Sequence, residues 1–152
     1  MTMADSAATD VLAELRKLII EFFAAVSFET GGRPPYGKLR GLFIEDGKLI
    51  RNTSGSPEIC TVDEFIAPRQ RMVESGELTC FQEVESKEIT EVFGNVAHRF
   101  STYDKRGVMN GTVFDGKGVI STQFVRTPNG WKMSCMAWDD ERPGLTIPDR
   151  YK

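Results

Sequence analysis

The sequence predicts an α+β domain in which three N-terminal helices pack on a curved antiparallel sheet of four main strands, plus a short strand or hairpin. Two observations predict it. Apolar residues recur at helical spacing before Gly76, and apolar and polar residues alternate at strand spacing after it. Helices followed by an antiparallel meander are typical of α+β domains. The length of 152 residues fits one domain, which we place at residues 10–152 after a flexible N-terminus at residues 1–9.

The first helix is predicted from Asp10 to Phe28, because apolar residues recur there every three or four positions. These residues are Leu12, Leu15, Ile19, Phe22 and Val26. The pairs Gly31-Gly32 and Pro34-Pro35 end this helix, and we expect a short second helix at Tyr36–Leu42.

A third helix is predicted from Thr61 to about Ser75. Thr61 and Glu64 match a capping box, in which each side chain accepts a hydrogen bond from the other residue's backbone N–H. Pro68 lies inside this segment, so we expect a kink or a later start. Before it, Asp46-Gly47 lies between two short apolar runs, and we interpret it as a turn beside a short strand.

Four strands are predicted after Gly76, where β-branched and aromatic residues alternate with polar ones. Their expected ranges are Leu78–Val92, Val96–Tyr103, Val119–Arg126 and Trp131–Trp138. Residues 93–95 and 127–130 are short enough for hairpin turns, so the first pair and the last pair should each be antiparallel neighbours. The glycine-rich stretch at residues 104–117 is expected to be a mobile connection.

Charge and hydropathy exclude several classes of partner. The net charge of −3 comes from interleaved acids and bases without a basic block, so we expect no nucleic acid partner. The N-terminus lacks the features of a secretory signal, and the longest apolar stretch, Leu18–Phe28, is broken by Glu21 and Ser27. We therefore expect a cytoplasmic protein with no membrane segment.

The cysteines and the histidine exclude the common metal sites. Cys60, Cys80 and Cys135 are odd in number and far apart, which favours reduced thiols over a disulfide framework or a thiolate metal site. His98 is the only histidine, so sites that need two imidazoles are excluded. The sequence also lacks a Walker loop and a strand-linked dinucleotide motif, and we predict neither a metal nor a cofactor.

Three short motifs carry a resemblance to a known superfamily. They are Phe93–Tyr103, Ser121–Gln123, and Trp138–Pro143 followed by Ile147, Pro148 and Tyr151. With the order of the elements, they resemble the nuclear transport factor 2-like superfamily, and the motifs themselves resemble an uncharacterised bacterial branch of it. The superfamily shares a cystatin-like cone with ketosteroid isomerase, scytalone dehydratase and the SnoaL-type polyketide cyclases. The resemblance implies a pocket for a small apolar molecule beneath the first helix and a homodimer formed through the outer face of the sheet.

The resemblance to ketosteroid isomerase does not extend to its catalytic groups. Phe22 stands where that enzyme has its oxyanion-hole tyrosine. Its general-base aspartate falls near Arg51 or Asn52 here, and its neutral acid falls near Thr122 or Gln123. That enzyme needs a carboxylate base and two donors to an enolate, so we do not expect steroid isomerisation.

His98 and Glu83 are the candidate catalytic residues. An imidazole titrates near neutral pH, so His98 could act as a general base, or it could be a structural or surface residue. Glu83 or Glu85 could enter the pocket, where burial would raise its pKa. The alternative for these acids is a solvated position or an ion pair with Arg99 or Lys87.

Two sets of residues alternate on the strand that carries His98, and only one set can face the pocket. His98 shares its parity with Phe100 and Thr102, whereas Arg99 and Tyr103 have the opposite parity. The sequence leaves this choice open. The residues expected to bind the ligand are Phe22, Tyr36, Glu83, Arg99, Tyr103, Gln123 and Trp138. Arg69 and Arg71 of the third helix are interpreted as a solvated face.

Two functions are compatible with these features. One is a small-molecule-binding protein or a cofactor-independent acid–base enzyme, similar to an isomerase, cyclase or dehydratase, that acts on an apolar compound. The other is a non-catalytic homodimeric protein-interaction module. The charge run Asp139–Arg142 is interpreted as structural, with Arg142 pairing a carboxylate, or as a contact at the pocket rim or the dimer.

Overall fold

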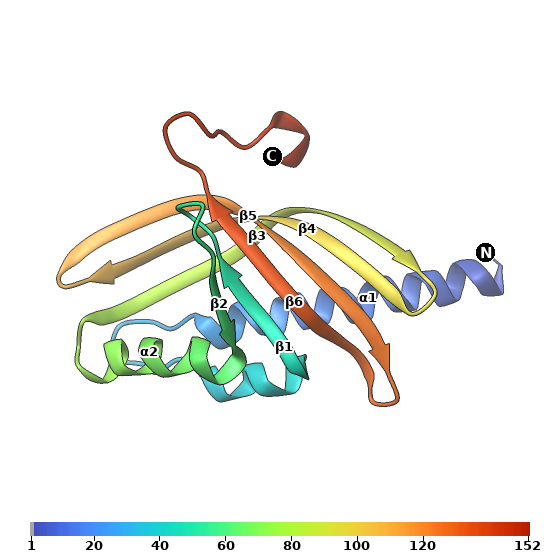
Figure 1. Ribbon diagram of the computed structural model, residues 1–152, viewed down its shortest axis with the longest axis horizontal. Coiled ribbons are helices and arrows are strands. Elements are labelled where there is room, and N and C mark those ends of the chain that lie inside the picture. Colours follow the sequence, from blue (N-terminus) through green and yellow to red (C-terminus); the bar gives the residue numbers. More distant parts are fainter. Residues whose placement is uncertain (1) are drawn as a thin grey trace.

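The computed structural model describes residues 2–152 as a curved six-stranded sheet with helices on its concave side (Figure 1). The helical elements are α1 (Met3–Val26), η1 (Tyr36–Leu42), α2 (Val62–Glu74) and η2 (Asp149–Tyr151). The strands are β1 (Phe43–Arg51), β2 (Glu58–Thr61), β3 (Leu78–Phe93), β4 (Val96–Met109), β5 (Thr112–Thr127) and β6 (Gly130–Asp140). The α+β class is confirmed.

The sheet has the order β2-β1-β6-β5-β4-β3. Strands β3 to β6 form the predicted antiparallel meander, and β1 and β2 form an antiparallel pair. β1 lies parallel to β6, so the sheet is mixed rather than purely antiparallel. The connection from β1 to β6 passes through α2 and the whole meander, which leaves room for the parallel pairing.

Both capping boxes determine where the long helices begin. Thr2 and Asp5 cap α1, so this helix begins at Met3 rather than at Asp10, and residues 3–9 are helical where we expected a flexible N-terminus. Thr61 and Glu64 cap α2 as predicted. The helix begins at Val62 with Pro68 inside it, so the later start is excluded.

The predicted turn at Asp46-Gly47 is instead an irregularity within strand β1. The register of β1 against β6 shifts between Phe43 and Lys48. A β-carbon on Gly47 would lie 3.0 Å from the Phe43 side chain, so glycine allows the chain to bend there without leaving the sheet.

The predicted mobile connection at residues 104–117 is wrong. β4 and β5 continue as paired strands to a two-residue turn at Asn110-Gly111, where both residues have positive φ, 50° and 78°. The glycines that suggested a loop make room for side chains within the sheet. A β-carbon on Gly107 would lie 2.6 Å from the Phe114 ring.

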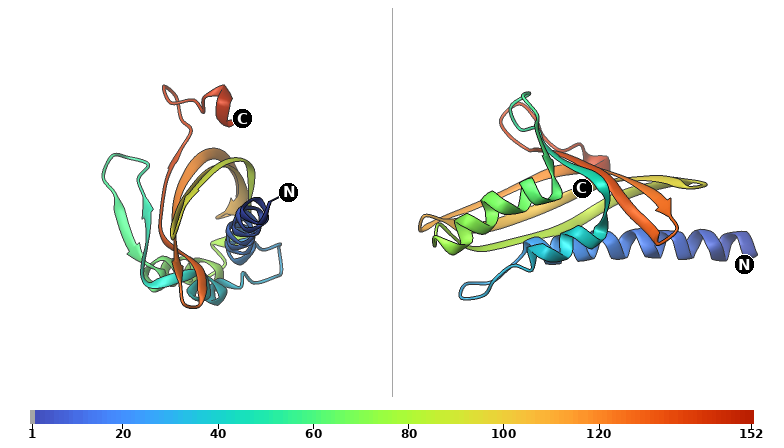
Figure 2. Two further views of the ribbon diagram at one scale, coloured as in Figure 1. Left: turned by 90° about the vertical axis from the view of Figure 1, so that its right-hand side faces the viewer. Right: turned by 60° about the horizontal axis from the view of Figure 1, so that its bottom comes forward.

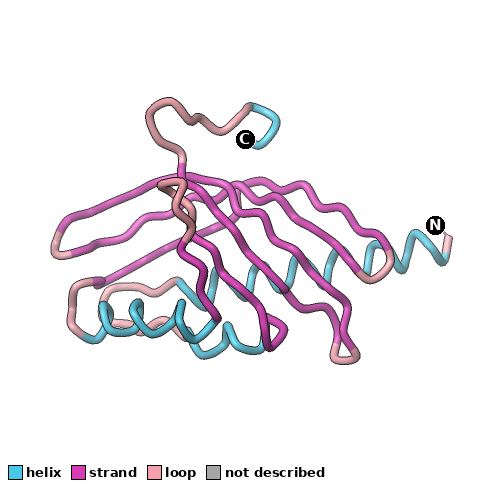
Figure 3. Tube along the Cα trace, viewed as in Figure 1, coloured by secondary structure: helices cyan, strands magenta, loops and turns pink. Residues whose placement is uncertain are grey.

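α1, η1 and α2 close the concave side of the sheet (Figures 2 and 3). The core lies between them and includes Leu15, Leu39, Phe124 and Met136, all with at most 1% of their surface exposed. After β6 the chain crosses to the opposite, outer side (Figure 1), where the Tyr151 carbonyl accepts a hydrogen bond from Thr102 Oγ1. No helix described in residues 2–152 is long and apolar enough to span a membrane.

Candidate functional site

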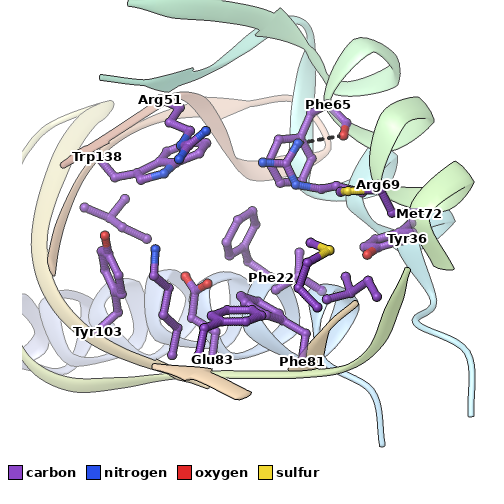
Figure 4. Close-up of a pocket in the computed structure, with 16 residues that line it drawn as sticks. Phe22, Tyr36, Arg51, Phe65, Arg69, Met72, Phe81, Glu83, Tyr103 and Trp138 are labelled. Carbon is purple, nitrogen blue, oxygen red and sulfur yellow. Dashed lines mark hydrogen bonds between the residues drawn. The ribbon is translucent and has the colours of Figure 1, made fainter. Parts of the chain in front are cut away.

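A cavity of about 240 Å³ lies between the helices and the concave face of the sheet (Figure 4). Its apolar lining consists of Phe22, Val26, Phe65, Met72, Leu78, Phe81, Met109, Phe114, Ile120 and Trp138. Its polar lining consists of Tyr36, Arg51, Arg69, Glu83, Tyr103 and Lys105. An apolar cavity of about 150 Å³ accepts a benzene ring, so this cavity has room for a compact molecule of one or two rings.

The end of α1 fixes β3 beside the cavity. The Phe28 and Phe81 backbones exchange two hydrogen bonds, with N···O distances of 2.8 and 3.0 Å. The Ser27 hydroxyl accepts a hydrogen bond of 3.1 Å from the Glu83 backbone N–H. Residues of one parity then face inward, so Phe81 and Glu83 both enter the cavity lining.

Glu83 is a half-buried residue whose carboxylate has no partner among residues 2–152. Its carboxylate points into the cavity (Figure 4), and it has no ion pair or side-chain hydrogen bond among residues 2–152. Burial raises the pKa of the Glu83 carboxyl to about 7; the nearby Lys105 charge opposes this rise and the Asp140 charge adds to it. A carboxyl with a pKa near neutrality can accept and return a proton.

Tyr103 and Lys105 of β4 share the carboxylate of Asp140 on β6. The Tyr103 hydroxyl donates to Asp140 Oδ1, and Lys105 Nζ lies 2.9 Å from both Asp140 oxygens. Burial, together with this hydrogen bond, raises the pKa of the Tyr103 hydroxyl, so Tyr103 remains neutral. Lys105 lies opposite Glu83 in the β3–β4 register, which places an ammonium group beside the free carboxylate.

Arg69 faces the cavity rather than solvent, so its interpretation as part of a solvated face is wrong. Its guanidinium carbon lies 3.6 Å from the centre of the Phe65 ring, and its Nη1 donates a 3.0 Å hydrogen bond to the Phe65 carbonyl. Arg71, two residues later, is exposed as expected. Side chains two positions apart point to different sides of a helix, which separates the two arginines.

Five of the residues expected to bind the ligand lie together in the lining of the cavity. They are Phe22, Tyr36, Glu83, Tyr103 and Trp138. Their common position supports the predicted pocket, and their role in binding stays a prediction. The set that contains Tyr103 faces inward on β4, which resolves the parity left open by the sequence.

Arg99 also faces inward but lies outside the cavity. It is 4% exposed, and its guanidinium pairs with Glu85, with an Nη2–Oε1 distance of 2.5 Å. Ser101 Oγ donates a 2.6 Å hydrogen bond to the same carboxylate. The ion pair that we considered for the two acids therefore belongs to Glu85, and it leaves Arg99 no free group for a ligand.

His98 and Gln123 lie on the outer face of the sheet, directly opposite each other in the β4–β5 register. His98 Nε2 lies 2.9 Å from Glu91 Oε1, and 61% of the His98 side chain is exposed. The Gln123 side-chain oxygen accepts a 3.2 Å hydrogen bond from Ser134 Oγ. Neither residue lines the cavity, so His98 takes the surface alternative and the expected place of Gln123 in the ligand site is wrong.

Lys105 and Arg51 line the cavity although the sequence predicted no such role for them, and Asp140 binds the lining residues Tyr103 and Lys105, in keeping with the pocket-rim alternative for its charge run. Lys105 has the same parity as Tyr103, and a longer strand would have predicted its position. Asp140 is the last residue of β6 and belongs to the charge run Asp139–Arg142, whose Arg142 pairs with Asp139, in keeping with the structural interpretation. No three His, Cys, Asp or Glu side chains in residues 2–152 are close enough together to hold a metal ion.

Solved structures show what the fold resembles. A nuclear transport factor 2 superfamily protein from Salmonella enterica is 16% identical, with a TM-score of 0.70 over 89% of this chain and 94% of its own. A nuclear transport factor 2-like protein with a cystatin-like fold from Novosphingobium aromaticivorans is 16% identical, with a TM-score of 0.70 over 97% and 90%. LinA is 12% identical, with a TM-score of 0.75 over 92% of each chain.

At these identities the similarity concerns the fold. No family model matches the sequence, and no curated protein matches it. The alignments extend over 89–97% of this chain and 90–94% of the solved structures. The fold that the sequence resemblance implied is thereby confirmed, and this chain has a cystatin-like fold similar to that of these structures.

Proposed function

We propose that this protein is a cofactor-independent acid–base enzyme that binds a compact apolar compound in the cavity and removes a proton from a carbon next to a carbonyl group. One observation carries the proposal: Glu83 is an unpaired carboxylate that faces a mostly apolar cavity. Similarity of fold does not establish function, so the proposal depends on the site.

The proposed step uses groups that already line the cavity. Glu83 accepts the proton, and the electron pair of the broken C–H bond moves to the carbonyl oxygen to form an enolate. The Lys105 ammonium, held by Asp140, stabilises that negative charge. Glu83 then returns the proton to carbon, so the enzyme is regenerated without an external reactant.

Deuterium exchange tests the proposal. A panel of mono- and bicyclic ketones, including 2-tetralone, is incubated with the protein in D₂O, and deuterium uptake at carbon is followed by mass spectrometry. We expect the wild type to accelerate uptake for at least one ketone and Glu83→Gln to reduce that acceleration by about 100-fold or more. Glu91→Gln is the matched control, because Glu91 is on the same strand but faces outward toward His98.

Two results would overturn the proposal. One is the absence of both acceleration and binding across the panel with the wild type. The other is acceleration that survives Glu83→Gln unchanged. Equal loss in Glu83→Gln and Glu91→Gln would indicate a structural effect, and circular dichroism of both variants separates this case from loss of the base.

A second candidate is the non-catalytic homodimeric module, favoured by the outer face of the sheet. Ile89 and Phe100 lie opposite each other there and remain 43% and 37% exposed. Large apolar side chains exposed next to each other on a sheet face are found at interfaces. Light scattering of the wild type and Ile89→Asp tests for a homodimer through this face. A dimer with no ligand binding in the cavity would favour this candidate over the enzyme.

A further inference from the structure

Arg69 is a cation in the cavity lining without an acidic partner. The ion pairs among residues 2–152 include none with Arg69, and its hydrogen bond to the Phe65 carbonyl uses only Nη1. No other hydrogen bond of the Arg69 side chain is formed among residues 2–152, and Figure 4 shows the guanidinium at the cavity. A largely buried guanidinium is costly unless an anion pairs with it.

Arg51 adds a second positive charge on the same side of the cavity. Figure 4 shows Arg51 and Arg69 on one side, with Glu83 and Tyr103 on the opposite side. Burial lowers the pKa of the Arg69 side chain, and the Arg51 charge acts in the same direction. The carboxylate nearest to Arg51 is that of Glu58, 3.9 Å away at the surface. Two cations therefore converge on an apolar space with no anion between them.

We propose that the ligand of this cavity is an organic carboxylate, an apolar ring system whose acid group is bound by Arg69 with support from Arg51. The inference rests on the proposed function, because it names the substrate class of the same site. The acid group lies at the arginine side and the reacting carbon lies at the Glu83 side. The reverse orientation places two carboxylates together, which is unfavourable.

The geometry of Arg69 favours a carboxylate over a larger anion. The Phe65 ring holds the guanidinium in one plane, and its free edge can donate two parallel hydrogen bonds to a planar acid. The cavity of about 240 Å³ has space for one or two rings plus this group. A phosphate ester with the same ring system is bulkier and carries a second charge.

A matched pair of probes tests the inference. Binding of naphthalene-2-carboxylate and of naphthalene-2-carboxamide is measured by calorimetry at pH 6, where the probe acid is ionised and Glu83 is mostly protonated. We expect the wild type to bind the acid at least about 10-fold more tightly than the amide, because charged hydrogen bonds exceed neutral ones. Arg69→Met should remove this preference, and Arg51→Met should reduce it. Arg71→Met is the matched control, because Arg71 is exposed on the same helix.

Each further result has a defined meaning. Equal binding of acid and amide by the wild type, binding of neither, or a preference that survives Arg69→Met overturns the inference. If Arg69→Met does not fold, Arg69→Lys and Arg51→Met decide, and both must weaken the preference. If Arg69→Met lowers the rate of ketone exchange but keeps the preference for the acid, Arg69 acts on the enolate. This result also overturns the inference that Arg69 binds the acid group.

The two proposals fail separately. Glu83→Gln should keep the preference for the acid, since Arg69 and Arg51 are intact. If the wild type prefers the acid but Glu83→Gln does not change the rate of exchange, the proposed proton transfer is wrong and the anion site stands. If Glu83→Gln abolishes exchange but the wild type shows no preference for the acid, the proposed proton transfer stands and the anion site is wrong.

Discussion

Gly118 of β5 lies directly opposite Tyr103 of β4, and a β-carbon at position 118 would lie 2.1 Å from the Tyr103 hydroxyl oxygen. The same β-carbon would lie 2.4 Å from the Asp139 carbonyl. No side chain fits in this space. Because Gly118 has no side chain, the Tyr103 hydroxyl can reach Asp140. Asp140 in turn holds Lys105 beside Glu83.

Gly118→Ala is expected to lower the free energy of unfolding by about 1–3 kcal/mol, because Tyr103 and the β6 backbone must both shift. Urea unfolding measures this change. Gly116→Ala is the control, since its β-carbon would lie 3.1 Å from Lys105 Cε, the end of a flexible side chain. Equal loss of stability in both variants would contradict the close fit between Gly118 and Tyr103.

Glu83 is expected to make the protein less stable as the pH rises from about 4.5 to about 7. Its pKa is raised from 4.5 to about 7 by burial, so in this range the folded state binds more protons than the unfolded state. The cost reaches at most about 3 kcal/mol above pH 7 and vanishes below pH 4.5. Glu83→Gln should therefore be more stable than the wild type at pH 8 and similar to it at pH 4. Urea unfolding at both pH values checks this, and a stability difference that does not change with pH would be inconsistent with a buried, titrating Glu83.

The rate of ketone exchange is expected to rise with pH and to level off above about pH 7. Glu83 acts as a base only when it is ionised, and burial raises its pKa to about 7. The measurement is kcat/KM for deuterium uptake between pH 5 and pH 9. The residual rate of Glu83→Gln should lack this step. A wild-type profile without a step between pH 6 and pH 8 would assign the proton transfer to another group.

His98→Ala is expected to leave exchange and stability unchanged, within about 2-fold in rate and about 0.5 kcal/mol in unfolding. His98 is exposed on the outer face, and its side-chain partner among residues 2–152 is Glu91. Exposed pairs of this kind contribute little. The measurement is the same deuterium uptake and urea unfolding, and a loss of rate comparable to that of Glu83→Gln would restore His98 as the candidate base.

Local signals in the sequence predicted most of the architecture. The capping box at Thr61 and Glu64 defined α2, and the apolar spacing around Leu15 and Ile19 defined the buried face of α1. Alternation predicted the strands of the meander, but the glycines led to a predicted β4 that ended too early and a predicted β5 that began too late. Gly107 and Gly118 are required by the rings that lie over them, and such a contact depends on the pairing of distant residues.

The site could be predicted less completely, because strand parity and ion-pair partners depend on tertiary packing. Glu83 and Glu85 have the same parity and the same chemistry in the sequence. Within residues 2–152, Glu85 pairs with the buried Arg99, whereas Glu83 has no arginine partner. Arg69 likewise differs from Arg71 only by its position around α2, and the phase of a short helix relative to the sheet is set by packing.

Arg99→Met is expected to lower the free energy of unfolding by about 3 kcal/mol, because it leaves the carboxylate of the Glu85 side chain, which is 17% exposed, without its counter-charge. Urea unfolding measures this loss, and Lys17→Met is the control, since the Lys17–Glu21 pair is exposed. Adding Glu85→Gln to Arg99→Met should recover part of the stability, because the uncompensated charge is removed. The ion pair lies outside the cavity, so the double variant should keep the preference for naphthalene-2-carboxylate. If that preference depended on Arg99 rather than on Arg69, the anion site would have to be moved along β4, away from Glu83.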